Sequence, residues 1–230
     1  MGGSLPHGRA DAGTLNPGDA EAFILANTTL SAPPHVPEIA LHLADEAHDL
    51  WLKTEDELAG IGLPPPFWAF AWAGGQALAR YLLDHPEEAA GKRVLDFATG
   101  SGLVGIAAMT SGAAHVLGSD IDPFAEAAVR ANAAANGVAM DFTTADLLSG
   151  TPPEVELICA ADVFYEKPMA DRVLPWLREA AGRGARVLIG DPGRTYFPKE
   201  GLVRLAEYQV PTTRELEDQA VKRSAVWALA

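Results

Sequence analysis

The spacing of apolar and polar residues predicts alternating strands and helices from residue 67 to the end of the chain. Short apolar runs, most of them ending near an aspartate, predict strands at 93–98, 115–120, 156–162 and 186–192. Longer stretches with helical spacing predict helices at 74–86, 103–112, 123–137 and 167–182. Residues 207–217 and 222–230 predict two closing strands with no long helix between them. This order predicts an α/β fold with a doubly wound, mostly parallel sheet and an antiparallel edge.

The chain before residue 67 has a different pattern. Residues 1–18 are rich in glycine and proline and predict a disordered tail. Residues 19–66 predict a short α+β extension, with a helix within 19–30, a strand at 38–44 and an acidic helix at 46–58. This extension either covers a cofactor or binds a protein substrate, or its acidic residues simply form a solvated helix face. Residues 67–230 then make up the main domain.

The overall charge narrows the classes of partner. A formal net charge of −14 at pH 7 disfavours binding to nucleic acid or to an anionic membrane surface. The same negative field suits a cationic substrate or a basic partner surface, although it also serves solubility alone. The single cysteine, Cys159, lies in an apolar run and is expected in the core. Without a second cysteine for a disulfide, a cytosolic or organelle-matrix compartment fits best, and a cytoplasmic location is predicted. The six histidines lack metal-ligand spacing, so no metal site is predicted.

Residues 94–105, VLDFATGSGLVG, join a predicted strand to a predicted helix through a glycine-rich turn. Glycines let the main chain approach a ligand closely, and the helix N-terminus offers free N–H groups. Taken alone, the pattern also fits a dinucleotide loop. Asp96 favours S-adenosylmethionine over NAD, because a carboxylate beside this turn repels a pyrophosphate and attracts a sulfonium and an α-amine. The alternative role of Asp96 is to cap or buttress the turn.

Two further aspartates follow the next predicted strands. Asp120 comes 24 residues after Asp96, where a carboxylate can accept hydrogen bonds from both ribose hydroxyls. A doubly wound sheet is expected to have a third strand between the helix at 123–137 and the strand at 156–162. Asp146, in TTADLL, follows that strand, where it can accept from the exocyclic amine of adenine. Asp146 is the weaker indication of the two, because aspartate also favours turns of this kind.

These segments resemble a known family. VLDFATGSG, SDID, ADLL and ADVFY are similar to the ordered motifs of class I, seven-β-strand methyltransferases. PPPFWAFAWAGGQALARYLLDHP, ADVFYEKPMADRVLPWL and VLIGDPGR resemble the bacterial branch of the lysine methyltransferases of the electron transfer flavoprotein β subunit, and the likeness covers about residues 22–230. It implies a monomer with a Rossmann-like, doubly wound sheet of seven strands and an antiparallel C-terminal edge strand. The implied cofactor is S-adenosyl-L-methionine and the implied product S-adenosyl-L-homocysteine.

The resemblance also implies roles for residues at the cofactor site. The implied cofactor-binding residues are Trp72, Asp96, Ala98, Thr99, Gly100, Gly102, Asp120, Ile121, Asp146, Leu147 and Ala161. Relatives often carry glycine where Ala98 stands, and the extra methyl group is expected to tighten the turn. Ile121 is expected to pack on adenine. Trp72 closes over the methionine end of the cofactor or, alternatively, joins an aromatic core, which is the expected place of Trp68.

The fourth predicted strand ends in Asp162-Val163-Phe164-Tyr165, which resembles an Asp-x-x-Tyr motif shared by related lysine methyltransferases. Asp162 is expected to hold the substrate ammonium or amine, and Tyr165 to line the lysine channel. The alternative for Asp162 is a cap at the strand end. Asp191 and Arg194 follow the fifth strand and either shape the substrate entrance or pin a turn. The Asn-Pro-Pro-Tyr motif of amide-nitrogen methyltransferases is absent from the sequence.

The implied activity is protein-lysine N-methylation of the electron transfer flavoprotein β subunit, which would present a basic, lysine-bearing surface. One alternative is a methyltransferase of a ribosomal protein or of a small amine such as nicotinamide. Another is a cofactor-binding module without catalysis.

Overall fold

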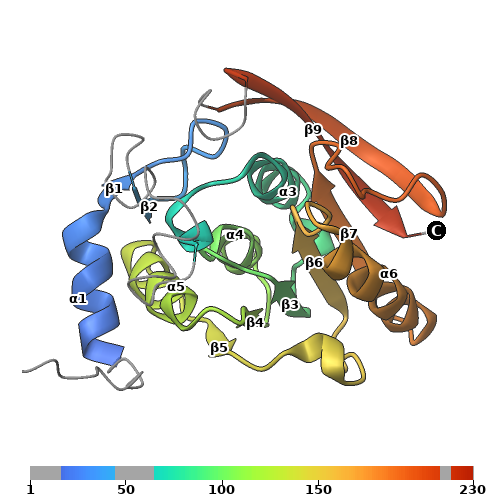
Figure 1. Ribbon diagram of the computed structural model, residues 1–230, viewed down its shortest axis with the longest axis horizontal. Coiled ribbons are helices and arrows are strands. Elements are labelled where there is room, and N and C mark those ends of the chain that lie inside the picture. The colour runs from blue at the N-terminus through green and yellow to red at the C-terminus, as the bar shows by residue number, and fades with distance from the viewer. Residues whose placement is uncertain (1–16, 45–64, 213–218, 230) are drawn as a thin grey trace, which may run out of the picture.

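The structure is a computed structural model that describes residues 17–44, 65–212 and 219–229. Its main element is a seven-stranded sheet of order β5-β4-β3-β6-β7-β9-β8 (Figure 1). The strands are β3 (Arg93–Phe97), β4 (His115–Ser119), β5 (Asp141–Thr143), β6 (Leu157–Ala161), β7 (Arg186–Asp191), β8 (Leu202–Pro211) and β9 (Val221–Leu229). Strands β3 to β7 are parallel to one another, whereas β9 is antiparallel to both of its neighbours. The predicted α/β fold is therefore confirmed.

Helices alternate with the parallel strands, as the sequence predicts. They are α3 (Ala73–Asp84), α4 (Leu103–Thr110), α5 (Pro123–Ala135) and α6 (Lys167–Gly182), with the 3-10 turns η1 (Phe67–Ala69), η2 (Pro86–Glu88) and η3 (Leu147–Ser149). Asp122 caps α5 by accepting a hydrogen bond from the Phe124 amide, and Pro123 occupies the first helical position. The predicted helix at 46–58 lies outside the described residues.

The C-terminal hairpin forms the predicted antiparallel edge, with one adjustment. Strand β9 lies between β7 and β8, so the outermost strand is β8. Strand β8 begins at Leu202, before the predicted start at 207, and it ends at Pro211 rather than at 217. Its first residues are exposed or half-buried at the edge of the sheet, which weakens the alternation that marks a strand in the sequence.

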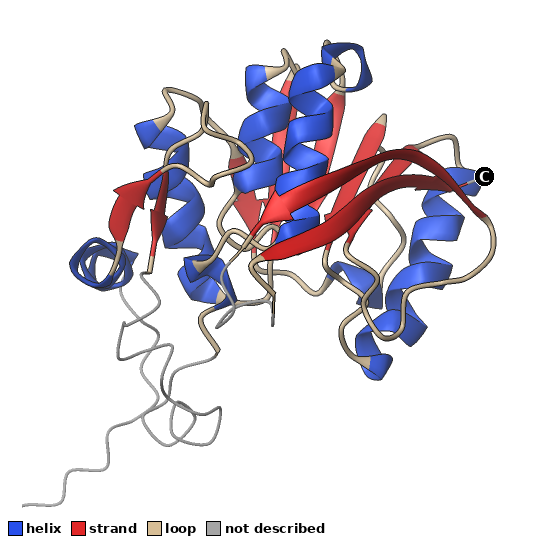
Figure 2. Ribbon diagram, turned by 90° about the horizontal axis from the view of Figure 1, so that it is seen from above, coloured by secondary structure: helices blue, strands red, loops and turns tan. Residues whose placement is uncertain are grey.

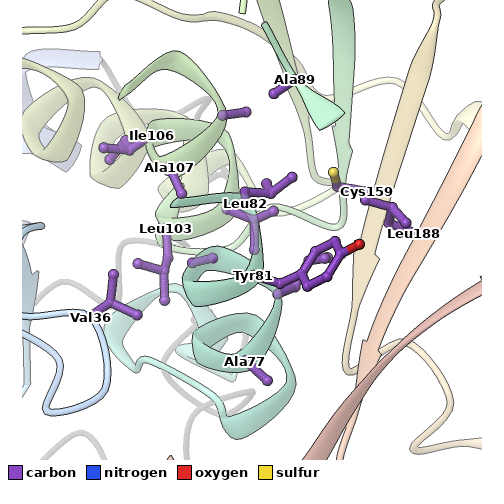
Figure 3. Close-up of a cluster of buried hydrophobic side chains, with 14 of the residues drawn as sticks. Val36, Ala77, Tyr81, Leu82, Ala89, Leu103, Ile106, Ala107, Cys159 and Leu188 are labelled. Atoms are coloured by element: carbon purple, nitrogen blue, oxygen red, sulfur yellow. The ribbon is translucent and has the colours of Figure 1, made fainter. Parts of the chain in front are cut away.

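The sheet separates two hydrophobic cores, because successive side chains of a strand point to opposite faces. On β3, Val94 packs with α3 and α4, whereas Leu95 packs with α6. Figure 1 shows α3 and α4 on one face of the sheet and α6 on the other. Figure 3 shows the first core, in which Cys159 of β6 lies beside Leu188 of β7. Cys159 is fully buried, as expected.

The N-terminal extension packs against α5. It contains α1 (Pro17–Asn27) and a hairpin of β1 (Thr29–Ser31) and β2 (Leu41–Leu43), which lies to one side of the main sheet (Figure 2). The predicted tail at 1–18 is therefore wrong at residues 17 and 18, where α1 begins; residues 1–16 lie outside the described part. Buried Asn132 of α5 accepts from the His42 amide at 2.6 Å and donates to the Ser101 carbonyl at 2.8 Å. One side chain thus joins the extension to the glycine-rich turn.

Candidate active site

The carboxyl ends of the parallel strands β3, β4, β6 and β7 meet at one edge of the sheet. The strand order reverses between β3 and β6, and doubly wound sheets bind ligands at such a switch point. A cavity of about 620 Å³ lies there, large enough for a nucleoside-sized ligand. Its lining contains every predicted cofactor-binding and catalytic residue except Gly102.

The glycine-rich turn owes its shape to left-handed backbone. Gly100 and Gly102 have φ angles of 51° and 83°, which favour glycine. Gly102 caps α4 and faces away from the cavity, since an added Cβ would lie 3.2 Å from the Val129 side chain. Ala98 also has a positive φ of 53°, so its methyl group makes this turn strained where a glycine would not be.

Asp96 stabilises the glycine-rich turn through two hydrogen bonds. It is almost fully buried, and its Oδ2 accepts hydrogen bonds from the Thr99 hydroxyl and, at 2.8 Å, from the Gly105 amide. Burial raises the pKa of Asp96 to about 6, against the lowering effect of these two donors. The buttressing role is thus visible in the contacts, and the same carboxylate also borders the cavity.

Asp120 stands at the end of β4 on the far side of the turn. Its Oδ2 accepts from the Gly100 amide at 3.0 Å, and its Oδ1 accepts from the Asp122 amide at 3.1 Å. Burial raises the pKa of Asp120, and it raises that of Asp122 to about 6. Beside them, Ile121 is 74% exposed. An apolar side chain at a cavity wall with this exposure is available to pack on a flat ring.

The third predicted acid is the most exposed. Asp146 begins η3, where its Oδ1 accepts from the Leu148 amide at 3.1 Å. Its Oδ2 pairs with Arg172 at 2.7 Å. Asp146 and Leu147 border the cavity on the β5 side, next to the exposed Ile121.

A cluster of aromatic side chains lines another part of the cavity, named its aromatic end. The indole N–H of Trp72 donates to the Phe67 carbonyl at 3.0 Å, and its ring lies 6.0 Å from that of Phe67. The Phe67 ring lies 5.8 Å from Tyr165, and both residues are more than 40% exposed. Trp68 is instead buried and stacked on Phe124, as expected of a core residue. Phe67 was not predicted, because η1 carries no periodic pattern that would indicate which way its side chains point.

Asp162 is held in an unusual conformation at the end of β6. Its φ is 57°, which is rare for a residue with a side chain. Its Oδ2 accepts from the Gly75 amide at the N-terminus of α3 at 2.9 Å. Its Oδ1 accepts from Arg194 Nε at 3.0 Å and from Arg194 Nη2 at 2.6 Å. The carboxylate is therefore fixed in direction, at the aromatic end of the cavity.

The loop after β7 holds Arg194 against this carboxylate. The Oδ1 of buried Asp191 accepts from the Gly193 amide at 2.6 Å and from the Arg194 amide at 2.7 Å. The Arg194 guanidinium carbon lies 5.7 Å from the centre of the Trp72 ring. Burial, with the nearby charge of Asp162, raises the pKa of Asp191 to about 7. Asp191 therefore pins the turn, while Arg194 borders the cavity.

The donor set fits S-adenosylmethionine better than a dinucleotide. Three carboxylates, Asp96, Asp120 and Asp122, border the cavity at the glycine-rich turn. The arginines among the described lining residues pair with other acids, Arg172 with Asp146 and Arg194 with Asp162. The three carboxylates at the turn would repel a pyrophosphate, whereas they attract a sulfonium and an ammonium.

Within residues 17–44, 65–212 and 219–229, no three or more His, Cys, Asp or Glu side chains are grouped to hold a metal ion. Of the helices described, none is long and apolar enough to cross a membrane.

Comparison with solved structures supports the fold. Magnesium protoporphyrin IX methyltransferase from Synechocystis PCC 6803, solved with bound S-adenosylmethionine, aligns with a TM-score of 0.50 at 21% identity, over 69% of this chain and 80% of that one. Thermoplasma acidophilum 1320 aligns with a TM-score of 0.52 at 18% identity, over 67% and 88% of the two chains.

Comparison of sequences identifies the family. A family model described as ribosomal protein L11 methyltransferase matches residues 76–163. The electron transfer flavoprotein beta subunit lysine methyltransferase of Xenopus laevis is 39% identical over 90% of this chain and 85% of its own length. The Homo sapiens protein of the same name is 34% identical over 94% and 84%. The chain is a methyltransferase that uses S-adenosylmethionine, and it belongs to the family of electron transfer flavoprotein beta subunit lysine methyltransferases.

Proposed function

We propose that the protein methylates lysine side chains of the electron transfer flavoprotein β subunit. The proposal is supported by relatives with that name that align over most of the chain. The observation that carries it within the site is the fixed carboxylate of Asp162, which borders the same cavity as the glycine-rich turn and lies at its aromatic end.

In this proposal, the cofactor lies along the ends of β3, β4 and β6. Asp120 accepts from the ribose hydroxyls, and Ile121, Asp146 and Leu147 surround the adenine. Asp96, Ala98, Thr99 and Gly100 form the turn beneath the methionine part, with Gly102 setting the backbone behind it. Trp72 and Ala161 border the methionine end. The supporting facts are the positions of these side chains along one cavity and the negative charge at its turn.

Bound S-adenosylmethionine supplies an electrophilic methyl group, whose bond to sulfur breaks as the amine nitrogen forms its bond to carbon, leaving the electron pair on the sulfur of S-adenosylhomocysteine. The leaving group is already cationic, so the protein contributes mainly proximity and orientation. Phe67, Trp72 and Tyr165 enclose the aliphatic part of the lysine and exclude water. Loss of water favours the neutral amine, which is the form that reacts.

Asp162 positions the amine in this mechanism. Its two oxygens already accept hydrogen bonds from the Gly75 amide and from Arg194, which fixes their direction. A carboxylate oxygen is an acceptor for a substrate N–H, and these contacts set the direction from which Asp162 would meet it. We therefore assign Asp162 to orientation of the nitrogen lone pair and Tyr165 to the wall of the lysine channel.

The substrate surface around the lysine is expected to be basic. The chain carries 31 acidic against 17 basic side chains, and such a field attracts a basic protein face. A monomer, a cytoplasmic location and the lack of a nucleic-acid partner remain predictions from the sequence.

The test is methyl transfer from labelled S-adenosylmethionine to purified electron transfer flavoprotein, followed by mass spectrometry of the β subunit. Wild type would be compared with Asp162→Asn and with Asp171→Asn, a matched control whose exposed carboxylate pairs only with Lys167 among the described residues. We expect lysine methylation by the wild type and the control, and a loss of at least about 100-fold in Asp162→Asn, because the nitrogen loses its orientation.

A second candidate is methylation of a ribosomal protein. The family model described as ribosomal protein L11 methyltransferase matches residues 76–163, which contain the glycine-rich turn and Asp162. The match leaves out the N-terminal extension and the C-terminal hairpin. Cofactor binding without any methylation of the flavoprotein would refute the first proposal and favour ribosomal protein L11 as the next substrate to test.

A further inference from the structure

Arg194 lines the cavity and forms an ion pair with Asp162. Both its Nε and its Nη2 donate to a single oxygen, Oδ1, of Asp162. The side chains are only 18% and 12% exposed, so water screens this pair less than an ion pair on the surface. The guanidinium also lies 5.7 Å from the centre of the Trp72 ring, which holds it over the cavity.

This pair meets a chemical difficulty that a lysine methyltransferase has to overcome. A lysine side chain has a pKa of about 10.4 in water, so nearly all of it is an unreactive ammonium at neutral pH. A carboxylate within a few ångströms of an ammonium raises its pKa further, by about 1 to 3 units. Asp162 without a counter-charge would therefore orient the nitrogen but also keep it protonated.

We propose that Arg194 is a positioning residue that pairs with Asp162 and neutralises its charge. Asp162 can then orient the substrate nitrogen without stabilising its ammonium form. The inference rests on the proposed lysine substrate. The guanidinium of Arg194 also repels a substrate ammonium beside it, which favours the neutral amine over the ammonium. The ammonium proton leaves to water before the transfer, and the new nitrogen–carbon bond then forms from the freed lone pair.

Contacts with neighbouring residues fix the position of Arg194. Asp191 on β7 accepts from the Arg194 amide, and Gly193 before it has a φ of 88°, which turns the chain toward β6. Among the described residues that border the cavity, Tyr165 and Glu166 are the titratable groups on the segment that follows Asp162. Asp191 is not among the residues that line the cavity, so its charge acts on the lysine only from behind Arg194.

The experiment measures kcat and KM for methylation of the flavoprotein between about pH 6.5 and 9.5, with Arg194→Gln, Arg194→Lys and Arg183→Gln compared to wild type. Arg183 ends α6 and is not among the residues lining the cavity, so its variant controls for the loss of one arginine. Calorimetric binding of S-adenosylhomocysteine and thermal melting confirm that each variant is folded and binds cofactor.

We expect Arg194→Gln to raise the apparent pKa of the kcat profile by about 1 unit or more, because Asp162 then holds the ammonium. Near pH 7, kcat would fall about 10-fold, and KM would fall with it, since the ammonium binds tightly in an unreactive form. At the alkaline plateau kcat would return to within about twofold of wild type. Arg194→Lys, which keeps the charge, would keep the wild-type profile.

Other outcomes would overturn the inference. If kcat of Arg194→Gln fell by the same factor at every pH, or if KM rose with an unchanged profile, Arg194 would only maintain the structure of the site. If the Lys variant behaved like the Gln variant, the charge would not be what matters. A wild type that transfers no methyl group to the flavoprotein would overturn the proposed function, and this inference with it.

Discussion

Two adjacent glycines at the start of α3 provide a sharp test of how the site is built. A Cβ added at Gly74 would lie 2.4 Å from the Gly190 carbonyl oxygen and 2.5 Å from Asp162 Oδ2. The backbone oxygen cannot move aside cheaply, so α3 has to shift on β7. Overpacking of this kind costs about 1–3 kcal/mol, partly offset by about 1 kcal/mol from the better helix propensity of alanine. A shift near 1 Å at Asp162 would reduce kcat on the order of 100-fold.

Gly75 is the matched control. A Cβ there would meet its nearest neighbours, the Ala161 and Leu103 side chains, at 4.0 Å. Gly75→Ala should therefore be as stable as wild type or up to about 1 kcal/mol more stable. Urea unfolding of both variants gives the free energies of unfolding, and methyl transfer at saturating cofactor gives kcat. A Gly74→Ala protein as stable and as active as wild type would refute the argument that contact between Gly74, Gly190 and Asp162 sets the site.

Three other variants test separate parts of the site. Asp120→Asn should weaken S-adenosylhomocysteine binding by about 10-fold or more, because a charged acceptor for the ribose is lost; unchanged affinity in calorimetry would remove Asp120 from the ribose. Asp191 has a folded pKa of about 7, above its usual 3.8, so the native state takes up a proton and gains stability as pH falls from 8 to 5. Asp96 and Asp122 also have raised pKa values and add to the same gain, so Asp191→Asn should reduce it by about 2–3 kcal/mol in urea unfolding at the two pH values; an unchanged gain would contradict the assignment. Asn132→Ala should destabilise the protein by about 2 kcal/mol, because the His42 amide and the Ser101 carbonyl lose a buried partner; a loss of a few tenths in the same assay would speak against this link.

The sequence predicts the features that depend on a local pattern of residues, such as the strands and the aspartates at their ends. The parallel strands are short and apolar, and the aspartates at or beyond their ends meet at one edge because parallel strands share a direction. That is why Asp96, Asp120 and Asp162 come together around one cavity. The glycine positions were readable too, since Gly100 and Gly102 occupy backbone that other residues avoid.

Contacts between segments that are distant in the chain could not be predicted from the sequence. Phe67 reaches the cavity because η1 turns its ring toward Tyr165, almost a hundred residues later in the chain. The pairing of Arg194 with Asp162 depends on the turn that Asp191 stabilises. The exclusion of Gly102 from the cavity wall follows from its packing against Val129 on α5. None of these contacts has a periodicity or spacing that the sequence alone reveals.

The left-handed backbone at Asp162 sets a local conformational cost against the contacts that its carboxylate makes. Among the described residues, Ala98 and Asp162 are the two without a glycine's freedom that adopt a positive φ, and both border the cavity. Each conformation costs on the order of 1 kcal/mol that a glycine would recover. A glycine at position 162 would recover this cost but would remove the acceptor of the Gly75 amide and of the largely buried Arg194 guanidinium, a loss of about 3 kcal/mol or more. Stability and turnover therefore both retain the carboxylate at a backbone angle that it does not favour.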